Sequence, residues 1–177
     1  MLVFACGLAP RMAAAIEPYP GGELDTEAAF LTRLAPFIDW PLDAFSSAKS
    51  PLVICVVAAD PLTGRVTRDA IRQKDGKRPI RLRVVGSSDG VDDCHILYLG
   101  AAGDSAAQIA RTVWRRPVLT VSRSEAGAYA TAMIVFVMDH RRVRFDIDDA
   151  TAANSRLAIS SKLLALARNV NPPFPLR

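Results

Sequence analysis

The sequence of 177 residues has few of the side chains that build reactive or metal-binding sites, with only three cysteines and two histidines. It has no C-x-x-C or H-E-x-x-H pattern, so a dedicated zinc site is not expected. The P-loop and G-x-G-x-x-G patterns are also missing, which removes the usual phosphate cradles. In residues 160–162, Ser-Ser-Lys, the lysine does not follow a serine by three positions, as the S-x-x-K nucleophile motif requires. We therefore predict a protein that is not an enzyme and that uses no cofactor or metal.

Charge of one sign is not concentrated anywhere along the chain. The net charge is +4, but 18 acidic residues are interspersed with 22 basic ones, and no five like charges follow one another. A basic stripe with interleaved aromatic residues is missing, so we do not expect a nucleic-acid partner. After residue 15 no apolar run approaches the roughly twenty residues of a membrane span. The chain itself is not expected to cross a membrane.

The first fifteen residues resemble the remnant of a secretory signal peptide. They are apolar at positions 2–9 and end in small residues, with Ala13 and Ala15 at the positions that a signal peptidase reads. No basic residues precede the apolar stretch, so a frayed cytoplasmic terminus is an alternative, and Cys6 faintly resembles a lipoprotein acylation site. Our prediction is an exported, soluble periplasmic protein from which residues 1–15 are removed.

Six segments have the pattern of β-strands. Continuous apolar runs predict strands buried on both faces, whereas strict alternation predicts strands with one wet face. The segments at 80–86 and 141–147 alternate, and their arginines would discourage edge-to-edge aggregation. The buried runs are 52–59, 94–99, 117–121 and 132–138.

Helical segments separate the strands up to residue 122, which requires crossover connections and a parallel sheet. We predict an α/β fold with three layers: a mostly parallel open sheet of about six strands, helices on both faces, and a C-terminal antiparallel hairpin. Strands 80–86 and 141–147 form its edges. The hairpin turns at 139–141, which places His140 beside two arginines and makes it a poor metal ligand.

Amphipathic helices are expected near both ends of the domain. Between Leu24 and Trp40, apolar residues recur at helical spacing until Pro36 kinks or ends the helix. After Asp148 the chain is expected to be helical in two pieces, with one stripe packed on the sheet and Ser160 or Ser161 as a cap. The stripe consists of Ile159, Leu163, Leu166 and Val170.

Cys55 and Cys94 are the two cysteines that remain in an exported chain. Cys55 lies within the first buried strand and Cys94 opens the strand placed next to it, so a disulfide is predicted. It would close a loop of about 40 residues, which the chain-entropy model values at about 4 kcal/mol. Two buried free thiols are the alternative. A reactive pair with His95 is disfavoured, because consecutive strand residues point to opposite faces.

Ligands commonly bind beyond the carboxyl ends of the strands in open parallel sheets. Here that edge includes Ala59, Asp60, Gly100 and Ser122, with "GAAG" at 100–103 between a strand and a helix. These are typical turn residues as well. The sequence therefore leaves open a second hypothesis, a stand-alone module that binds a small molecule.

The chain resembles the YfiR family of periplasmic proteins over residues 27–168. The resemblance is carried, in order, by "EAAFLTRLAPFIDWP", "LVICVVAADPL", "CHILYLG", "PVLTVS", "AMIVFV", "RVRFDID" and "LAISSKLLALAR". It implies a single domain at 24–170, followed by a Pro-rich tail at 171–177.

The resemblance also implies a function. Family members are non-enzymatic regulators that hold the periplasmic part of an inner-membrane diguanylate cyclase inactive, which restrains cyclic-di-GMP synthesis and biofilm formation. They tend to dimerise, and cysteine bridging influences their activity. A homodimer and a membrane cyclase are thus the partners expected here, and the sequence indicates no partner-binding residues.

Overall fold

The structure, a computed structural model, describes residues 22–57, 60–72, 78–86, 90–101, 104–123 and 132–171. Its larger sheet has the strand order β3-β2-β4-β5-β6-β7-β9. The first five of these strands are parallel, β7 runs antiparallel to β6, and β9 is parallel to β7. The bounds are β2 Leu52–Val57, β3 Ile80–Val85, β4 Ile96–Ala101, β5 Leu119–Arg123, β6 Ile134–Asp139, β7 Arg142–Ile147 and β9 Asn169–Val170.

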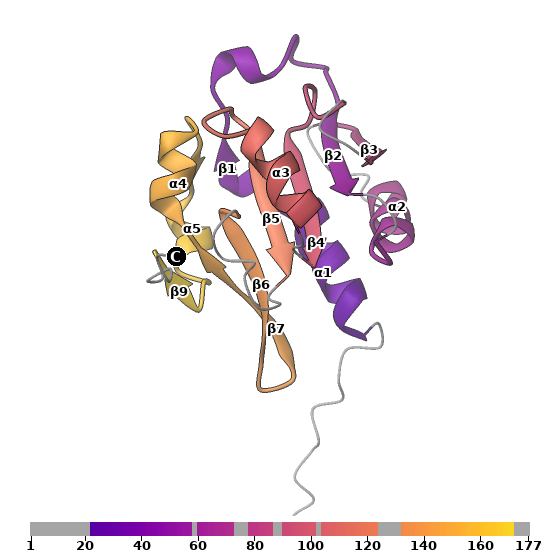
Figure 1. Cartoon of the computed structure of the whole chain (residues 1–177), viewed down its shortest axis with the longest axis vertical. Coiled ribbons are helices and arrows are strands. Elements are labelled where there is room, and N and C mark those ends of the chain that lie inside the picture. Colours follow the sequence, from indigo (N-terminus) through magenta and orange to yellow (C-terminus); the bar gives the residue numbers. More distant parts are fainter. Residues whose placement is uncertain are drawn as a thin grey trace, which may run out of the picture.

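Helices cover both faces of this sheet, which confirms the three-layer α/β prediction (Figure 1). One face packs on α3 (Asp104–Thr112), through residues such as Cys55, Leu97 and Ile109. The other face packs on α1 (Gly22–Arg33) and α2 (Thr63–Arg72) and contains the larger apolar cluster. The two clusters follow the side-chain alternation of the strands, since Ile54 and Val56 face α1 while Val53 and Cys55 face α3.

The chain leaves α1 where the sequence predicted a break. The helix ends at Arg33, and Pro36 lies in a 3-10 turn, η1 (Ala35–Phe37). The next residues form β1 (Ile38–Asp39), which pairs antiparallel with β8 (Ala158–Ile159) in a separate two-stranded sheet. A second 3-10 turn, η2 (Leu42–Ala44), begins the segment 40–51 that leads into β2.

The predicted C-terminal helical stripe is wrong. The helices after Asp148 are short, α4 (Asp149–Asn154) and α5 (Ser161–Leu164), and Ile159 lies in β8 between them. Leu166 is 58% exposed and Val170 belongs to β9. The expected Ser160 cap is present, since its hydroxyl accepts a hydrogen bond from the amide of Lys162 at 3.2 Å.

β9 also corrects the predicted edge of the sheet, because it pairs with β7 at Asp146 and Ile147. The contact has a side-chain component: the guanidinium of Arg168 donates to the carboxylate of Asp146 at 2.9 and 2.5 Å, and Asn169 donates at 3.1 Å. Asp146 is only 2% exposed. A buried carboxylate needs hydrogen-bond donors, and Arg168 and Asn169 supply them when the end of the chain pairs with the sheet. This requirement outweighs the helical spacing of the apolar residues in the C-terminal segment.

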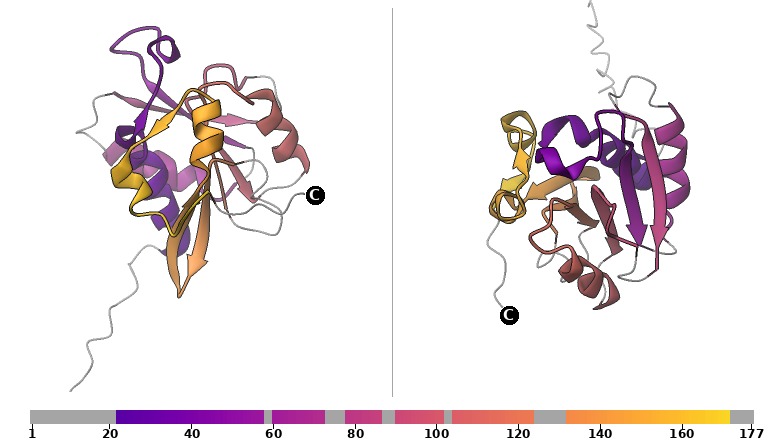
Figure 2. Two further views of the ribbon diagram at one scale, coloured as in Figure 1. Left: turned by 90° about the vertical axis from the view of Figure 1, so that its left-hand side faces the viewer. Right: turned by 90° about the horizontal axis from the view of Figure 1, so that it is seen from above.

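The β6–β7 hairpin extends past the rest of the sheet (Figures 1 and 2). Its turn residues His140 and Arg141 have φ values of 46° and 62°, as a tight two-residue hairpin requires. Among the described residues, no helix has the length and apolarity needed to cross a membrane.

Candidate functional site

The predicted disulfide is present between Cys55 and Cys94, whose Cα atoms are 5.8 Å apart. Cys55 lies in β2 and Cys94 just before β4, and both side chains pack in the cluster under α3. The exposed fraction is 0% for Cys55 and 4% for Cys94. The bridge therefore joins the middle of β2 to the segment that enters the adjacent strand β4, within the core.

His95 turns away from Cys94, as the alternation of a strand predicts. The amide of Val53 donates to its Nδ1 at 3.1 Å, and Nε2 lies 3.0 Å from the carbonyl oxygen of Ala44. Nδ1 is thus unprotonated and Nε2 donates its hydrogen. Burial, together with the nearby charge of Arg78, lowers the pKa of His95, although the bond to Ala44 and the charge of Asp93 act in the opposite direction.

Aromatic and cationic groups stack outward from this histidine. The rings of Phe45 and His95 are stacked, with centroids 4.2 Å apart, and Cζ of Arg78 lies 3.8 Å from the Phe45 centroid. Arg78 also donates to the carbonyls of Ser47 and Ser50, each at 2.9 Å. The stack fastens the segment 40–51 across the amino ends of β2 and β4, and sequence patterns gave no signal for it.

We expect the protein to lose stability as the pH falls below about 6.5, because His95 is held neutral in the folded state. Its folded pKa lies below the unfolded value, so above pH 6.5 both states are neutral, and below it the unfolded state binds the proton first. The loss can reach about 1.4 kcal/mol per pH unit until the folded pKa is passed. Urea unfolding between about pH 7.5 and 5.5 measures it.

Two variants isolate the His95 effect. His95→Gln should flatten this part of the pH profile. His140→Gln is the comparison variant, since His140 lies on the hairpin turn with its side chain 95% exposed. A wild-type profile that is flat over this range, or one that His140→Gln flattens, would contradict the assignment.

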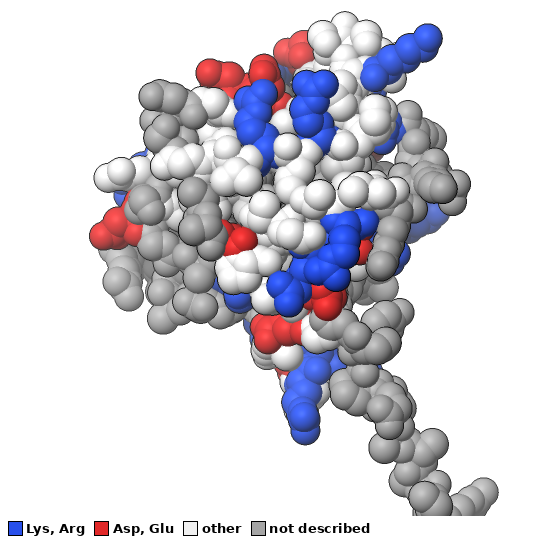
Figure 3. Space-filling model, turned by 90° about the vertical axis from the view of Figure 1, so that its right-hand side faces the viewer, with Lys and Arg blue, Asp and Glu red and all other residues white. Residues whose placement is uncertain are grey.

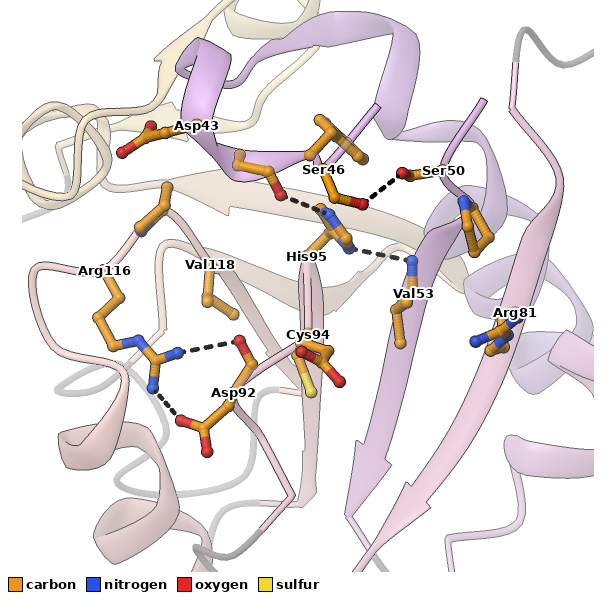
Figure 4. A pocket seen from close by; sticks show the side chains of 15 residues that line it. Asp43, Ser46, Ser50, Val53, Arg81, Asp92, Cys94, His95, Arg116 and Val118 are labelled. Atoms are coloured by element: carbon orange, nitrogen blue, oxygen red, sulfur yellow. Dashed lines mark hydrogen bonds and ion pairs between the residues drawn. The ribbon is translucent and has the colours of Figure 1, made fainter. Parts of the chain in front are cut away.

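A cavity of about 410 Å³, here called the amino-end cavity, opens beside the disulfide and the histidine. Its walls come from segment 40–51, from β2 and β3, and from residues 92–95 and 116–118 (Figure 4). Charges of both signs line it: Arg81 and Arg116, and Asp43, Asp92 and Asp93. Arg116 donates to Asp92 at 2.8 and 2.9 Å.

A second polar group, the carboxyl-edge cluster, consists of Glu27, Tyr98 and Arg123. Arg123 donates to both oxygens of the Glu27 carboxylate, with contacts of 2.8 to 3.1 Å, and the Tyr98 hydroxyl lies 3.3 Å from that carboxylate. Glu27 is 1% exposed although it lies on α1. Burial raises the pKa of Glu27, against the lowering effect of Arg123. Burial and the charges of Glu27 and Asp60 raise the pKa of Tyr98.

Sequence reasoning missed this cluster, although the pattern held a signal. Glu27 lies four positions before Leu31 on the buried side of α1, and Tyr98 and Arg123 share the strand face of Ile96 and Val121. Buried polar side chains are nearly always hydrogen-bonded, so three of them that face the same apolar cluster are expected to bond to one another.

The structure places only some of the residues of the predicted ligand-binding edge next to one another. Asp60 lies against Gly100, with its Oδ2 only 2.6 Å from the position that a Cβ would take, but Gly100 and Ser122 are buried. Ala59 and residues 102–103 lie outside the described residues, as do 1–15 and the tail after 171. The amino-end cavity is at the opposite ends of the strands.

Gly100 has a φ of +65°, so Gly100→Ala should cost about 2 kcal/mol through backbone strain and contact with Asp60. Gly64→Ala in α2 is the matched control, because a Cβ there meets nothing within 4 Å, and a gain of up to about 1 kcal/mol is expected. Chemical denaturation of both variants measures the difference. Equal stability of the two variants would be the contrary result.

A G-x-S-x-G spacing occurs at Gly86–Gly90, but the nucleophile motif of that spacing needs a strand, a turn and a helix. Here it follows β3 and leads to β4 without a helix among the described residues, and its central Ser88 lies outside them. The described part of the chain also contains no group of three metal-ligating side chains.

Comparison with known proteins gives both a family and a fold. A family model described as YfiR/HmsC-like matches residues 25–168. No curated protein matches the sequence.

Two solved structures are similar in fold. One is a conserved domain protein from Vibrio cholerae O1 biovar El Tor, with a TM-score of 0.54 and 10% identity over 84% of this chain. The other is the ABC domain from Streptococcus pneumoniae in complex with L-Trp, with a TM-score of 0.50 and 9% identity over 83% of this chain. The alignments span 60% of each of those chains. At such identities the likeness concerns the fold alone.

Proposed function

Because the chain belongs to the YfiR/HmsC-like family, we propose that it binds the periplasmic part of an inner-membrane diguanylate cyclase and holds that enzyme inactive. The family is regulatory and non-catalytic, and membership implies a periplasmic regulator of diguanylate cyclase signalling. Direct inhibition would lower cyclic-di-GMP and restrain biofilm formation. The observation that carries this proposal is the family match over residues 25–168.

The proposal includes a folded unit at 24–170, export directed by residues 1–15, and a homodimer as the working form. The disulfide supports an oxidising compartment, since such bridges persist mainly in exported proteins. The disulfide also supports inhibition through protein–protein contact, because a cross-link between two buried strands makes the surface around them more rigid.

Deletion of the gene in its native host tests the inhibition. We expect cellular cyclic-di-GMP to rise several-fold and to return to its original level when the exported protein is supplied again. A version without residues 1–21 should fail to restore it. Co-purification with the periplasmic region of a membrane cyclase should accompany the effect. Unchanged cyclic-di-GMP after deletion would refute the proposal.

A stand-alone sensor of a small molecule is the second candidate, and the amino-end cavity favours it. Its volume of about 410 Å³ lies within the range of small-molecule pockets, and its mixed charges suit a zwitterion such as an amino acid. The similar Streptococcus pneumoniae structure holds L-Trp.

A thermal-unfolding screen with amino acids and nucleotides tests the sensor. A ligand at 100 times its dissociation constant should add about 2.7 kcal/mol of stability. An Arg116→Met variant, which changes the cavity wall, should abolish the gain. A screen without any shift would remove this candidate.

A further inference from the structure

Within the described part of the chain, no strand pairs with the outer backbone edge of β3. β2 is the strand paired with β3 among the described residues, and the larger sheet ends there. The amide of Leu52 donates to the carbonyl of Pro79 at 2.9 Å. In a parallel ladder this bond turns the backbone groups of alternate residues, Ile80, Leu82 and Val84, away from β2. Their N–H and C=O groups can therefore receive another strand.

The two faces of this edge differ in chemistry. Arg81 and Arg83 point to the α3 side, the side on which Val85 is buried, and Arg83 is bonded to Asp93 and to the carbonyl of Gly90. Arg81 is exposed and has no ion-pair partner in the described part of the chain.

The α2 side of the same edge is apolar. Leu82 packs against the larger apolar cluster, Val84 is 53% exposed, and Ile71 on the adjacent α2 is 72% exposed. In the space-filling view of this side of the molecule, basic side chains lie above and below a mainly uncharged central area, with acidic side chains beside them at both ends (Figure 3). The edge is thus basic on one side of the sheet and apolar on the other.

We propose that the β3 edge is a docking site for an extended segment of a partner protein in which acidic and apolar residues alternate. Strand addition would satisfy the outward backbone groups of β3. The acidic side chains would lie over Arg81 and Arg83, and the apolar ones would cover Val84 on the α2 side, because residues of a strand alternate between its faces.

Charge argues against a second copy of this chain at the same edge. Antiparallel pairing of two β3 strands about Leu82 would set Arg81 opposite the copy's Arg83 on one face. Like charges directly opposite each other destabilise a strand pair. A homodimer would therefore form through another surface, and the β3 edge would remain free for the partner strand.

A labelled peptide of about seven residues, alternating Glu and Val, is the probe, and fluorescence anisotropy measures its binding to the oxidised full chain. We expect saturable binding that weakens at least about tenfold when Lys replaces Glu in the peptide. Arg81→Glu should weaken it by a similar factor. Arg144→Glu on β7 is the matched control, an exposed strand arginine five strands away in the sheet order, and should change binding less than about twofold.

A peptide with N-methylated amides at its edge-facing positions tests the backbone contacts without altering the protein, and its binding should be lost. Equal binding of the Glu and Lys peptides, equal effects of the two arginine variants, or full binding of the N-methylated peptide would each overturn the proposal. The proposal would also be overturned if the chain dimerised through its β3 edges and therefore failed to bind the peptide. The assay contains no cyclase, so its outcome is independent of the proposed function.

Discussion

Replacing Cys94 by alanine should lower the free energy of unfolding by about 4 kcal/mol. The bridge joins residues 39 positions apart, and in the chain-entropy model closing such a loop restricts the unfolded state by about that amount. The side chain itself is small and 4% exposed, so its truncation adds little. Urea unfolding of the oxidised wild type and of the variant gives the two free energies directly.

Reduction provides the control for this experiment. A thiol reductant should destabilise the wild type by a similar amount and should leave Cys94→Ala unchanged, because that variant has no bridge to lose. The wild type and the variant should then nearly coincide under reducing conditions. A difference below about 1 kcal/mol between the oxidised proteins would show that the unfolded chain gains little freedom from cleavage of the bridge.

Replacing Arg123 by methionine should destabilise the fold by about 3 kcal/mol, because it leaves the Glu27 carboxylate buried without its partner. The Glu27 side chain is 1% exposed in this ion pair. The pKa of Glu27, already raised by burial, should rise further. The folded state then holds the proton more tightly than the unfolded one, so the destabilisation should shrink as the pH falls toward about 4.5.

Two comparisons separate the charge from the packing. Adding Glu27→Gln to Arg123→Met removes the buried charge and should recover part of the stability at neutral pH. Asp43→Asn breaks the exposed pair of Asp43 with Arg156, whose side chains are 66% and 54% exposed, and should cost less than about 1 kcal/mol. Equal losses in Arg123→Met and Asp43→Asn would contradict a dominant role for the buried pair.

Most of the sheet could be predicted because its strands follow local rules. Apolar runs such as 52–57 are found in the interior, and the alternating pattern of Ile80–Val85 is found at an edge. The C-terminal segment did not follow its own pattern. Its apolar spacing favoured a helical stripe that ran from Ile159 to Val170, but the buried Asp146 accepts hydrogen bonds from Arg168 and Asn169, which favours β9. That preference depends on contacts 22 and 23 residues apart, which periodicity does not contain.

The candidate sites also divide into one that local sequence patterns predict and others that depend on the tertiary arrangement. The disulfide could be predicted, since the sequence places Cys55 in one strand and Cys94 at the start of the segment that forms the adjacent strand. The pairing of Glu27 with Arg123 spans 96 residues and needed the relative placement of α1 and β5. The stack of Phe45 on His95 needed the path of segment 40–51, for which neither helical nor strand periodicity exists.

The two edge strands of the larger sheet differ, and this difference predicts how many partner segments one molecule can bind. At one end, β9 contributes only two residues and is held by side chains of its own chain, so it offers little template for further growth. At the other end, β3 presents six residues. Strand addition would therefore be confined to one terminus of the sheet, so that each molecule captures a single partner segment and polymerisation into a continuous filament does not follow.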